Sequence, residues 1–237
     1  MARLQENVRL PSPYIFLYNP LSYRVWTISL LNARSLRLHF NDVLKDPITK
    51  SSDLLMYTET NTYNHQANMM NILDYKQEIV PKDTDKKRHG LACYWRNTIS
   101  CARKLAFEGQ NIEILQMDFK DFMIILLYRS PSLPLSLFMS DLKDLFSSLD
   151  VYQQRTIILG DFNVDAFGDN YTQLSELMGR HNFTNINSVK THIQGSCLDH
   201  VYLSSDLLTT YHACYAHPSY YSDHFHVTLQ LQRSQWI

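Results

Sequence analysis

Cysteine pairs, long apolar runs and a surplus of basic residues are all missing from this sequence. Its cysteines are scattered without a CxxC pair, so neither a zinc ribbon nor a dithiol redox motif is indicated: Cys93, Cys101, Cys197 and Cys214. This usage favours a reducing, intracellular compartment, nuclear or cytoplasmic. The longest aliphatic run, Met123 to Leu127, is far shorter than the roughly 20 residues that span a bilayer. We therefore expect no membrane anchor, and the first residues do not resemble a secretory signal.

The chain also lacks the excess positive charge of a typical nucleic-acid-binding domain. It has 22 Lys and Arg against 23 Asp and Glu, a formal net charge of -1 at pH 7. The densest basic region can contact phosphates, but such a run is more often only solvated: Lys82, Lys86, Lys87, Arg88, Arg96, Arg103 and Lys104. Any electrostatic contact with nucleic acid must therefore come from local basic patches.

With 237 residues and 45% hydrophobic content, the chain can bury one substantial core, and one monomeric α/β domain is the default expectation. Apolar runs of strand length alternate with segments of helical spacing. We expect helices at 36–46, 135–149 and 171–181, and a loop with at most one short helix at 60–88. Strands are expected at 24–32, 53–59, 90–95, 111–119, 121–128, 155–160, 198–203, 207–216 and 225–231.

Polar residues stand where several of these strands end or begin. Strands end on or just before Asn32, Glu59, Tyr128 and the pair Asp161 and Asn163, whereas Asp199 and the pair Asp223 and His224 open strands. The ends of some strands and the starts of others lie on one edge of a mixed sheet, so these side chains can converge. Asp161 and Asn163 are two apart and would point the same way in an extended strand.

This set suits the hydrolysis of a phosphodiester. The reaction needs an activated water and stabilised charge on the phosphoryl oxygens, which a hard cation held by carboxylates supplies. Glu59 is the best candidate ligand for such a cation. Asp161 can orient or deprotonate the water, and a cationic His224 held by Asp199 can donate to the phosphate.

Each residue alone also has an ordinary structural interpretation. GDFN is as typical of a turn after a buried strand as of a catalytic site, and SDH by itself is weaker still. Asp199 and Glu59 are also compatible with plain strand termini, and Tyr128 with a core-edge aromatic. The order of the residues, each at a strand boundary, is what favours a common site.

The strings NARSL, TET, YRSP, GDFN, THIQGSCLDHVYLS and SDH, in that order, resemble the endonuclease/exonuclease/phosphatase superfamily. The resemblance covers residues 25–231 and is nearest to the apurinic-like endonuclease domains of non-LTR retrotransposons and related mobile elements. It implies a four-layer α/β sandwich in which two mixed β-sheets pack face to face between helices. Residues 1–24 match nothing and are expected to lie outside this domain, which would comprise residues 25–237.

The resemblance also implies a role for each site residue. Asn32 and Glu59 would form the metal site for Mg²⁺ or Mn²⁺, with Asp223 beside the metal. Asp161 would activate the water and Asn163 would position it. Asp199 would orient His224, and Tyr128 would contact the phosphate. Thr191 and Ser196 match the flanking motif and are given only a structural role. Arg34 stands where some repair enzymes of the family have a carboxylate, as in the retroelement branch.

The function that follows is a Mg²⁺-dependent endonuclease that nicks DNA and derives from a mobile element. Two alternatives remain open: the same chemistry on another phosphate ester, and an inactive remnant that binds nucleic acid or a protein. A zinc site from His212, His217, His224 and His226 is only weakly supported, because no recognised ligand spacing is present.

Overall fold

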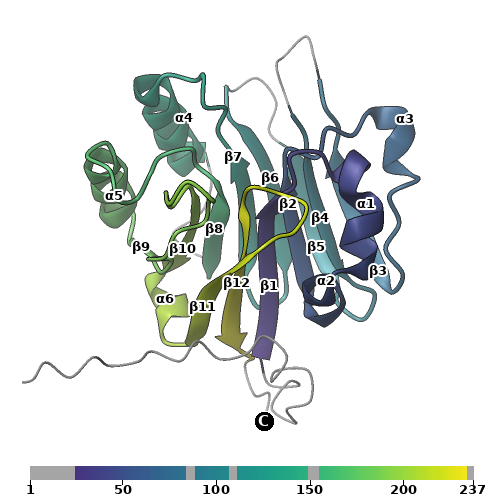
Figure 1. Cartoon of the computed structure of the whole chain (residues 1–237). Helices are drawn as coiled ribbons and strands as arrows, with labels where there is room; N and C mark the ends of the chain where they lie inside the picture. Colours follow the sequence, from purple (N-terminus) through teal and green to yellow (C-terminus); the bar gives the residue numbers. More distant parts are fainter. Residues whose placement is uncertain (1–24, 84–88, 107–110, 149–154, 234–237) are drawn as a thin grey trace, which may run out of the picture.

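Two six-stranded mixed sheets pack face to face in this computed structural model, which describes residues 25–83, 89–106, 111–148 and 155–233 (Figure 1). The first sheet has the order β11-β12-β1-β2-β4-β3 and the second β5-β6-β7-β8-β10-β9. The first sheet comprises β1 (Val25–Asn32), β2 (Leu54–Thr58), β3 (Tyr75–Val80), β4 (Leu91–Arg96), β11 (Tyr211–Pro218) and β12 (Phe225–Gln232). The second comprises β5 (Cys101–Ala106), β6 (Glu113–Phe119), β7 (Met123–Tyr128), β8 (Thr156–Asp161), β9 (Phe183–Asn185) and β10 (Asp199–Ser204).

Helices flank the two sheets on their outer faces. The helices are α1 (Leu36–Lys45), α2 (Pro47–Ser51), α3 (Asn64–Ala67), α4 (Leu135–Ser148), α5 (Tyr171–Arg180) and α6 (Ser205–Leu208). In Figure 1, α4 and α5 lie on one side of the molecule and α1 to α3 on the other. The expected four-layer sandwich is confirmed. No helix within the described ranges has the length and apolar character needed to cross a membrane.

Three apolar clusters fill the spaces between the four layers. One lies between the sheets and draws on strands of both, one joins α4 and α5 to the second sheet, and one joins α1 to the first sheet. Strand alternation explains this division, because successive side chains point to opposite faces of a sheet. In β7, for example, Ile124, Leu126 and Tyr128 face the other sheet, whereas Met123, Ile125 and Leu127 face the helices.

Local sequence explains how the helices begin and end. The Ser35 hydroxyl caps the first turn of α1 by accepting from the Leu38 amide at 3.3 Å. Asp46 ends that helix and caps α2 through the Ile48 amide, with Pro47 at the first position of α2, where no amide hydrogen is needed. The apolar stripe of 135–149 forms α4 as expected, with Leu149 outside the described residues.

Several sequence expectations were wrong in detail. The segment 60–88 contains β3 as well as the short α3, so it is not a plain loop. The expected strand at 207–216 begins later, because α6 ends at Leu208 and β11 runs from Tyr211 to Pro218. The sequence did not predict the strands β5 and β9. β5 and β9 lie at the edges of their sheet, and exposed residues interrupt the apolar runs by which strands are recognised.

Candidate active site

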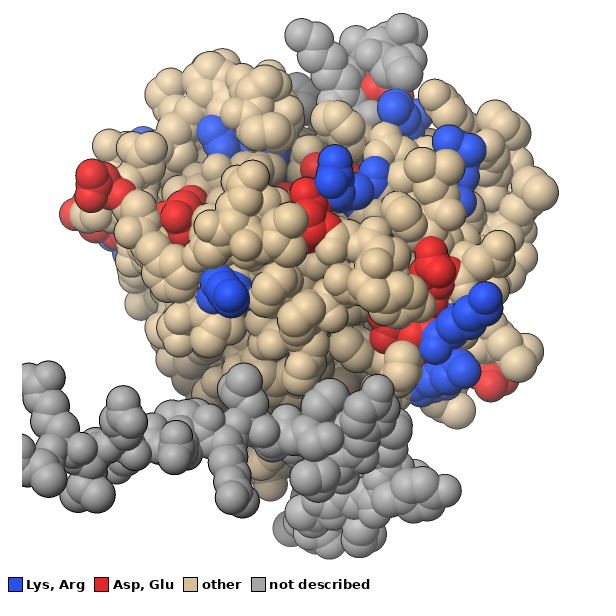
Figure 2. Space-filling view, in the orientation of Figure 1, with Lys and Arg blue, Asp and Glu red and all other residues tan. Residues whose placement is uncertain are grey.

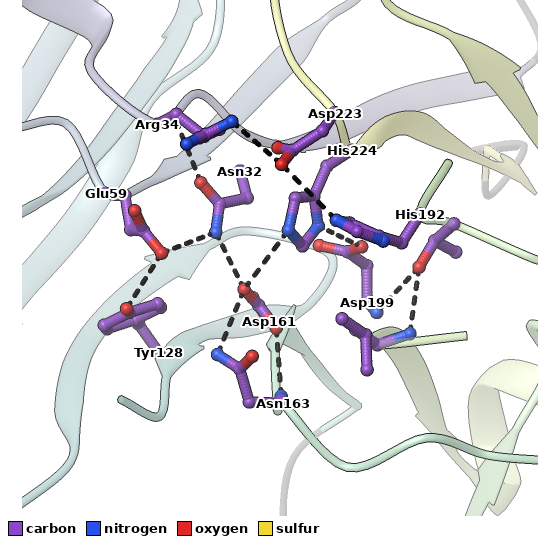
Figure 3. A network of polar contacts seen from close by, with 12 residues as sticks. Asn32, Arg34, Glu59, Tyr128, Asp161, Asn163, His192, Asp199, Asp223 and His224 are labelled. Carbon is purple, nitrogen blue, oxygen red and sulfur yellow. Dashed lines mark hydrogen bonds and ion pairs between the residues drawn. The ribbon is translucent and has the colours of Figure 1, made fainter. Parts of the chain in front are cut away.

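Strand alternation brings four of the predicted site residues to one end of the space between the sheets. Asn32 follows Ile28 and Leu30 on the inward face of β1, and Tyr128 follows Ile124 and Leu126 on β7. By the same period of two, Asp161 closes the inward face of β8 and Asp199 opens that of β10. The apolar core between the sheets therefore ends in a polar cluster (Figure 3).

The directions of the strands place these ends on a common edge. β1 and β2 are parallel, as are β7 and β8, so their carboxyl ends coincide. β10 runs antiparallel to β8, with Asp199 directly opposite Asp161, and β12 runs antiparallel to β1. The convergence expected from the sequence is therefore confirmed by the pairing register.

Asp161 lies at the centre of the cluster and is 0% exposed. Its Oδ2 accepts hydrogen bonds from Asn32 Nδ2 at 2.7 Å and Asn163 Nδ2 at 3.3 Å, and its Oδ1 accepts from the Asn163 amide at 2.9 Å. Burial and the neighbouring charge of Asp199 raise the pKa of Asp161 to about 7, although His224 and Asn32 act in the opposite direction. A carboxyl group with such a pKa can take up and release a proton near neutral pH.

Asn163 contacts Asp161, but not as two residues of one extended strand. β8 ends at Asp161, and Asn163 has a left-handed backbone with φ of 48°. Its Nδ2 also donates to the Arg129 carbonyl at 2.7 Å. Glu59 and Arg34 have φ of 49° and 51°, so three non-glycine residues around the site adopt this uncommon conformation.

His224 and Asp199 form a buried pair beside Asp161. Nδ1 of His224 is 2.8 Å from Asp199 Oδ2, and its Nε2 lies 4.0 Å from Asp161 Oδ2. Burial lowers the pKa of a histidine, but the charges of Asp199 and Asp161 outweigh it and raise the pKa of His224 to about 9. His224 is therefore an imidazolium near neutral pH, as expected from its partner.

Glu59 and Tyr128 meet on the other side of Asn32. Glu59 Oε1 accepts from Asn32 Nδ2 at 2.9 Å and from the Tyr128 hydroxyl at 2.8 Å. Burial and the charge of Glu59 raise the pKa of Tyr128, so its phenol stays neutral and donates. The expected contact of Tyr128 with phosphate stays a prediction, because its hydroxyl is held here by Glu59.

Asp223 lies in the loop just before β12, on the far side of Asn32 and Arg34 from Glu59 (Figure 3). Its Oδ2 pairs with Arg34 Nη1 at 2.9 Å and lies 3.4 Å from His192 Nε2. Its Oδ1 is buried and has no hydrogen-bond partner. An orphaned carboxylate oxygen of this kind is open to a cation.

The donor set of the site fits a hard divalent cation. Four carboxylates, of Glu59, Asp161, Asp199 and Asp223, lie close to the cations Arg34 and protonated His224. Burial, and after it the charge of Asp199, raises the pKa of Asp161. Oxygen ligands are available from Glu59, the Asn32 amide and Asp223, which are the three predicted metal ligands, and such donors suit Mg²⁺.

Three further residues support the site: Thr191, which the sequence motif indicated, and Ser222 and His192, for which the sequence predicted no role. Thr191 Oγ1 accepts from the Leu198 and Asp199 amides, both at 3.0 Å, which supports its structural role. Ser222 Oγ donates to the Asn32 carbonyl at 2.7 Å and accepts from the His224 amide at 3.1 Å, so it ties the loop to β1. His192 lies beside His224, with ring centroids 4.9 Å apart. Its position next to Thr191 in the TH string was the available signal.

The weak zinc hypothesis is not supported. His226 points away from the site, with its Nε2 3.0 Å from Asp46 Oδ2. Among the described residues, two groups of three His, Cys, Asp or Glu side chains have ligand atoms within 4.8 Å of one another, and neither contains His212, His217 or His226. The groups are His192, Asp223 and His224, and Asp161, Asp199 and His224.

The described residues of the basic region contact separate partners. Lys104 pairs with Glu78, Arg96 stacks on the Tyr75 ring at 4.4 Å, and Lys82 donates to Asn61 Oδ1 at 3.0 Å. Residues 86–88 lie outside the described residues. On the face shown in Figure 2, basic and acidic side chains are interspersed and no broad basic area is visible. The near-neutral net charge is thus matched by a mixed surface on this face.

Two packed mixed sheets with a carboxylate-rich cluster at their common edge are the arrangement found in a class of phosphoester hydrolases. The chain belongs to the Endonuclease/Exonuclease/phosphatase family, whose profile matches residues 21–224. The match begins near the expected domain boundary at residue 25. No significantly similar sequence is found among curated proteins.

Solved structures share this fold at low sequence identity. The endonuclease domain of TRAS1, a telomere-specific non-LTR retrotransposon, is 14% identical with a TM-score of 0.68, over 88% of this chain and 98% of that one. The AP endonuclease LMAP from Leishmania major is 17% identical with a TM-score of 0.70, over 92% and 90%. A variant of the 3' phosphatase NExo from Neisseria, bound to a product DNA hairpin, is 13% identical with a TM-score of 0.69, over 87% and 99%.

Proposed function

We propose that the protein is a Mg²⁺-dependent phosphodiesterase that nicks DNA. The observation that supports this most is the position of Asp161: fully buried, bonded to Asn32 at 2.7 Å, and 4.0 Å from Nε2 of the His224 imidazolium. A proton acceptor and a cationic donor therefore lie side by side, where one can act on a water and the other on a phosphate oxygen. This is the pairing that hydrolysis of a phosphodiester requires.

Glu59 and Asn32 would hold the metal ion, and the free Oδ1 of Asp223 offers a further ligand. When bound, a divalent cation polarises the phosphoryl oxygens and stabilises the leaving group. The Tyr128 hydroxyl donates to Glu59 Oε1, which leaves the other carboxylate oxygen, Oε2, free to serve as a ligand. Mn²⁺ has similar preferences and would substitute for Mg²⁺.

Asp161 of the second sheet, together with His224 from the loop before β12 of the first sheet, would handle the proton. Asp161 accepts it from the attacking water, since the pKa of this carboxyl is about 7. Asn163 orients Asp161 through its amide and its side chain, and the Arg129 carbonyl fixes Asn163 in turn. His224, held by Asp199, donates to a non-bridging phosphate oxygen as negative charge accumulates there.

DNA as substrate, and descent from a mobile element, rest on the retroelement-like strings in the sequence. NARSL, TET and THIQGSCLDHV include Asn32, Glu59, Thr191 and Asp199, all of which belong to the observed cluster or support it. The shared fold of the TRAS1 domain agrees with this origin. Arg34, where repair enzymes of the family have a carboxylate, also agrees with the retroelement branch.

A phosphatase acting on another phosphate ester is the second candidate. The fold is shared with a 3' phosphatase, and one fold serves several substrates. An inactive remnant is less favoured, because polar site residues contribute little to folding and would be lost without selection. Each of the predicted site residues contacts another residue of the site.

The direct test incubates supercoiled plasmid with the folded protein in Mg²⁺ and in EDTA. We expect nicking in Mg²⁺, none in EDTA, and none from Asp161→Ala or His224→Ala. Asp169→Ala is the matched control, because Asp169 is an exposed carboxylate outside the site and should leave activity unchanged. A folded wild-type protein that binds Mg²⁺ but does not nick would exclude the endonuclease. Equal activity in all samples would instead reveal a contaminating nuclease.

A panel of phosphate esters separates the first two candidates. Nicked plasmid without release of inorganic phosphate from 3'-phosphorylated DNA would identify an endonuclease. Phosphate release without nicking would identify the phosphatase.

A further inference from the structure

We propose that His192, Asp223 and His224 form a second metal site, selective for borderline transition ions such as Zn²⁺ or Co²⁺, which shares Asp223 with the proposed Mg²⁺ site at Glu59. One ligand atom from each of the three lies within 4.8 Å of the others. His192 Nε2 and Asp223 Oδ2 are 3.4 Å apart, about the ligand separation of a tetrahedral ion with bonds of roughly 2.0–2.1 Å. Two imidazoles and one carboxylate, with a fourth position open, are a common donor set for such an ion.

The backbone around the three residues is fixed. His192 and His224 form an isolated antiparallel bridge, supported by bonds from the Phe225 amide to the Thr191 carbonyl at 2.7 Å and from the Ile193 amide to the Asp223 carbonyl at 2.9 Å. The imidazole rings lie at 74° with centroids 4.9 Å apart. The ligands therefore come from two short segments that are already joined, which reduces the entropy lost on binding.

His224 is already oriented as a metal-bound histidine would be. Its Nδ1 is held by Asp199 at 2.8 Å, which leaves Nε2 as the nitrogen that can bind an ion once it has released the proton of the imidazolium, a cost that grows as the pH falls. A carboxylate behind the imidazole is the usual outer partner of a histidine ligand, since it fixes the ring and increases the basicity of the other nitrogen. Thr191 in turn holds the Asp199 backbone.

Asp223 has a free oxygen for the ion. Its Oδ2, the oxygen 3.4 Å from His192 Nε2, is also paired with Arg34, whereas its Oδ1 is buried without a hydrogen-bond partner. The carboxylate must therefore either release Oδ2 from Arg34 or turn Oδ1 towards the ion. The Arg34 side chain is 60% exposed, so the guanidinium can stay on one oxygen or move into solvent when the other binds a cation. Arg34 should still weaken binding, because its charge repels the ion.

Binding through His192 Nε2 has one further cost. Nδ1 of His192 accepts from the Gln194 amide at 3.2 Å, and a neutral ring bound through Nε2 carries its proton on Nδ1. That hydrogen bond must then break. Gln194 is exposed, so water can take over its amide, and the loss is small beside that of a metal ligand.

Occupancy would block the reaction, an effect that rests on the proposed function. An Nε2 bound to an ion cannot donate to a phosphate oxygen, and Asp223 cannot serve both sites at once. The transition ion would therefore act as an inhibitor. The other group, Asp161, Asp199 and His224, needs no separate ligand, because it is the proton-handling part of the site already described.

Titration of the full-length protein with Co²⁺ in excess Mg²⁺ tests the site through the visible absorption of bound cobalt, without any substrate. We expect one bound Co²⁺ per chain, and an affinity that falls by about 100-fold or more in His192→Gln, the loss expected when a ligand is removed. Arg34→Ala should tighten binding several-fold. Arg37→Ala is the control, because Arg37 is an exposed arginine at the second residue of α1, and it should not change the affinity.

His212→Gln is the control histidine, since His212 is exposed on β11 and outside both groups. Unchanged affinity in His192→Gln, a loss in His212→Gln, or no binding by the folded wild-type protein would each overturn the site. If His192→Gln does not fold, Asp223→Asn should show the same loss of affinity.

Zn²⁺ added to the Mg²⁺-dependent nicking assay tests inhibition separately. Measured against its own uninhibited rate, His192→Gln should need at least about 10-fold more Zn²⁺ than wild type for half inhibition, in line with its weaker binding. Equal sensitivity of the two proteins would refute the inhibitory role. Cobalt binding that depends on His192 in a protein that never nicks would leave the site standing and exclude the proposed endonuclease.

Discussion

The two sheets contribute to the site in different ways. The second sheet supplies Asp161 and Asp199, which are fully buried and sit inside regular strands. The first supplies Glu59 and Asp223, which lie in the segments next to β2 and β12 and remain partly accessible. Three contacts join the halves. Asn32 Nδ2 donates to both Glu59 and Asp161, the Tyr128 hydroxyl of β7 donates to Glu59, and His224, from the loop before β12, pairs with Asp199.

This difference separates two tasks. Burial raises the pKa of Asp161, because water does not screen its charge, so the second sheet suits proton transfer. Partly accessible carboxylates can exchange water for a metal ion, so the first sheet suits metal binding. Changes in the second sheet should therefore affect the chemical step, and changes in the first should affect the metal requirement.

The largest effect is expected from Asp161→Asn. Loss of a positioned general base costs about 10²- to 10⁴-fold in rate, and the variant cannot accept the proton of the water. Single-turnover cleavage of plasmid at saturating Mg²⁺ measures the loss. Asp169→Asn, at an exposed position, is the control. Wild-type rates in Asp161→Asn would assign proton transfer to another group and remove the distinction between the sheets.

Gly160→Ala should disrupt the second sheet itself. A Cβ at Gly160 would lie 1.8 Å from the Leu127 carbonyl oxygen of β7, and the residue has φ of 152°. This overlap is with backbone and cannot be relieved by a rotamer change, so we expect a loss of about 3 kcal/mol or more in the free energy of unfolding. Urea denaturation measures it.

Gly179→Ala is the matched control. A Cβ there would meet nothing within 4 Å, and the residue lies in α5, where alanine is favoured by up to about 1 kcal/mol. If both variants were equally stable, close approach of β7 and β8 would not be what positions Asp161.

Asp199→Asn should lower the pKa of His224. The pKa of about 9 depends on the Asp199 charge, and without it burial lowers the value towards or below the ordinary 6.5. Because the folded pKa is raised, the stabilisation by protonated His224 is fully present below pH 6.5 and is lost as pH rises through about 9. Asp199→Asn should remove this loss.

NMR titration of the metal-free protein measures the histidine pKa values directly. Asp42→Asn is the control, since Asp42 pairs with His39 at 3.6 Å on α1 and should leave His224 unchanged. A His224 pKa that stays near 9 in Asp199→Asn would contradict the assigned cause.

The positions of several site residues on the strands could be predicted from the sequence. Because side chains alternate between the two faces of a strand, counting by two from the core between the sheets places Asn32, Tyr128, Asp161 and Asp199 on one face. β7 and β8 are nearly continuous apolar runs, so their sequences do not show which face is inward. The sequence could not give the left-handed backbone of Glu59 and Asn163, since neither is glycine and the conformation is imposed by the surrounding contacts.

His192 and the strand β3 were beyond prediction for a related reason. His192 contributes through a bridge to His224, 32 residues away in the chain, and its place in the TH string does not indicate that contact. The residues of β3 are mostly half-buried at a sheet edge and show no clear alternation. Both depend on contacts between distant segments, which a single sequence does not specify.

The Mg²⁺ dependence of single-turnover cleavage, measured side by side in Glu59→Gln and Asp161→Asn, tests the division of tasks most directly. We predict that Glu59→Gln raises the Mg²⁺ concentration for half-maximal rate by about 10-fold or more and recovers much of the rate at saturation. Asp161→Asn should keep the wild-type midpoint and lose rate at every concentration. The reverse pattern, or the same pattern in both variants, would contradict the division of tasks between the two sheets.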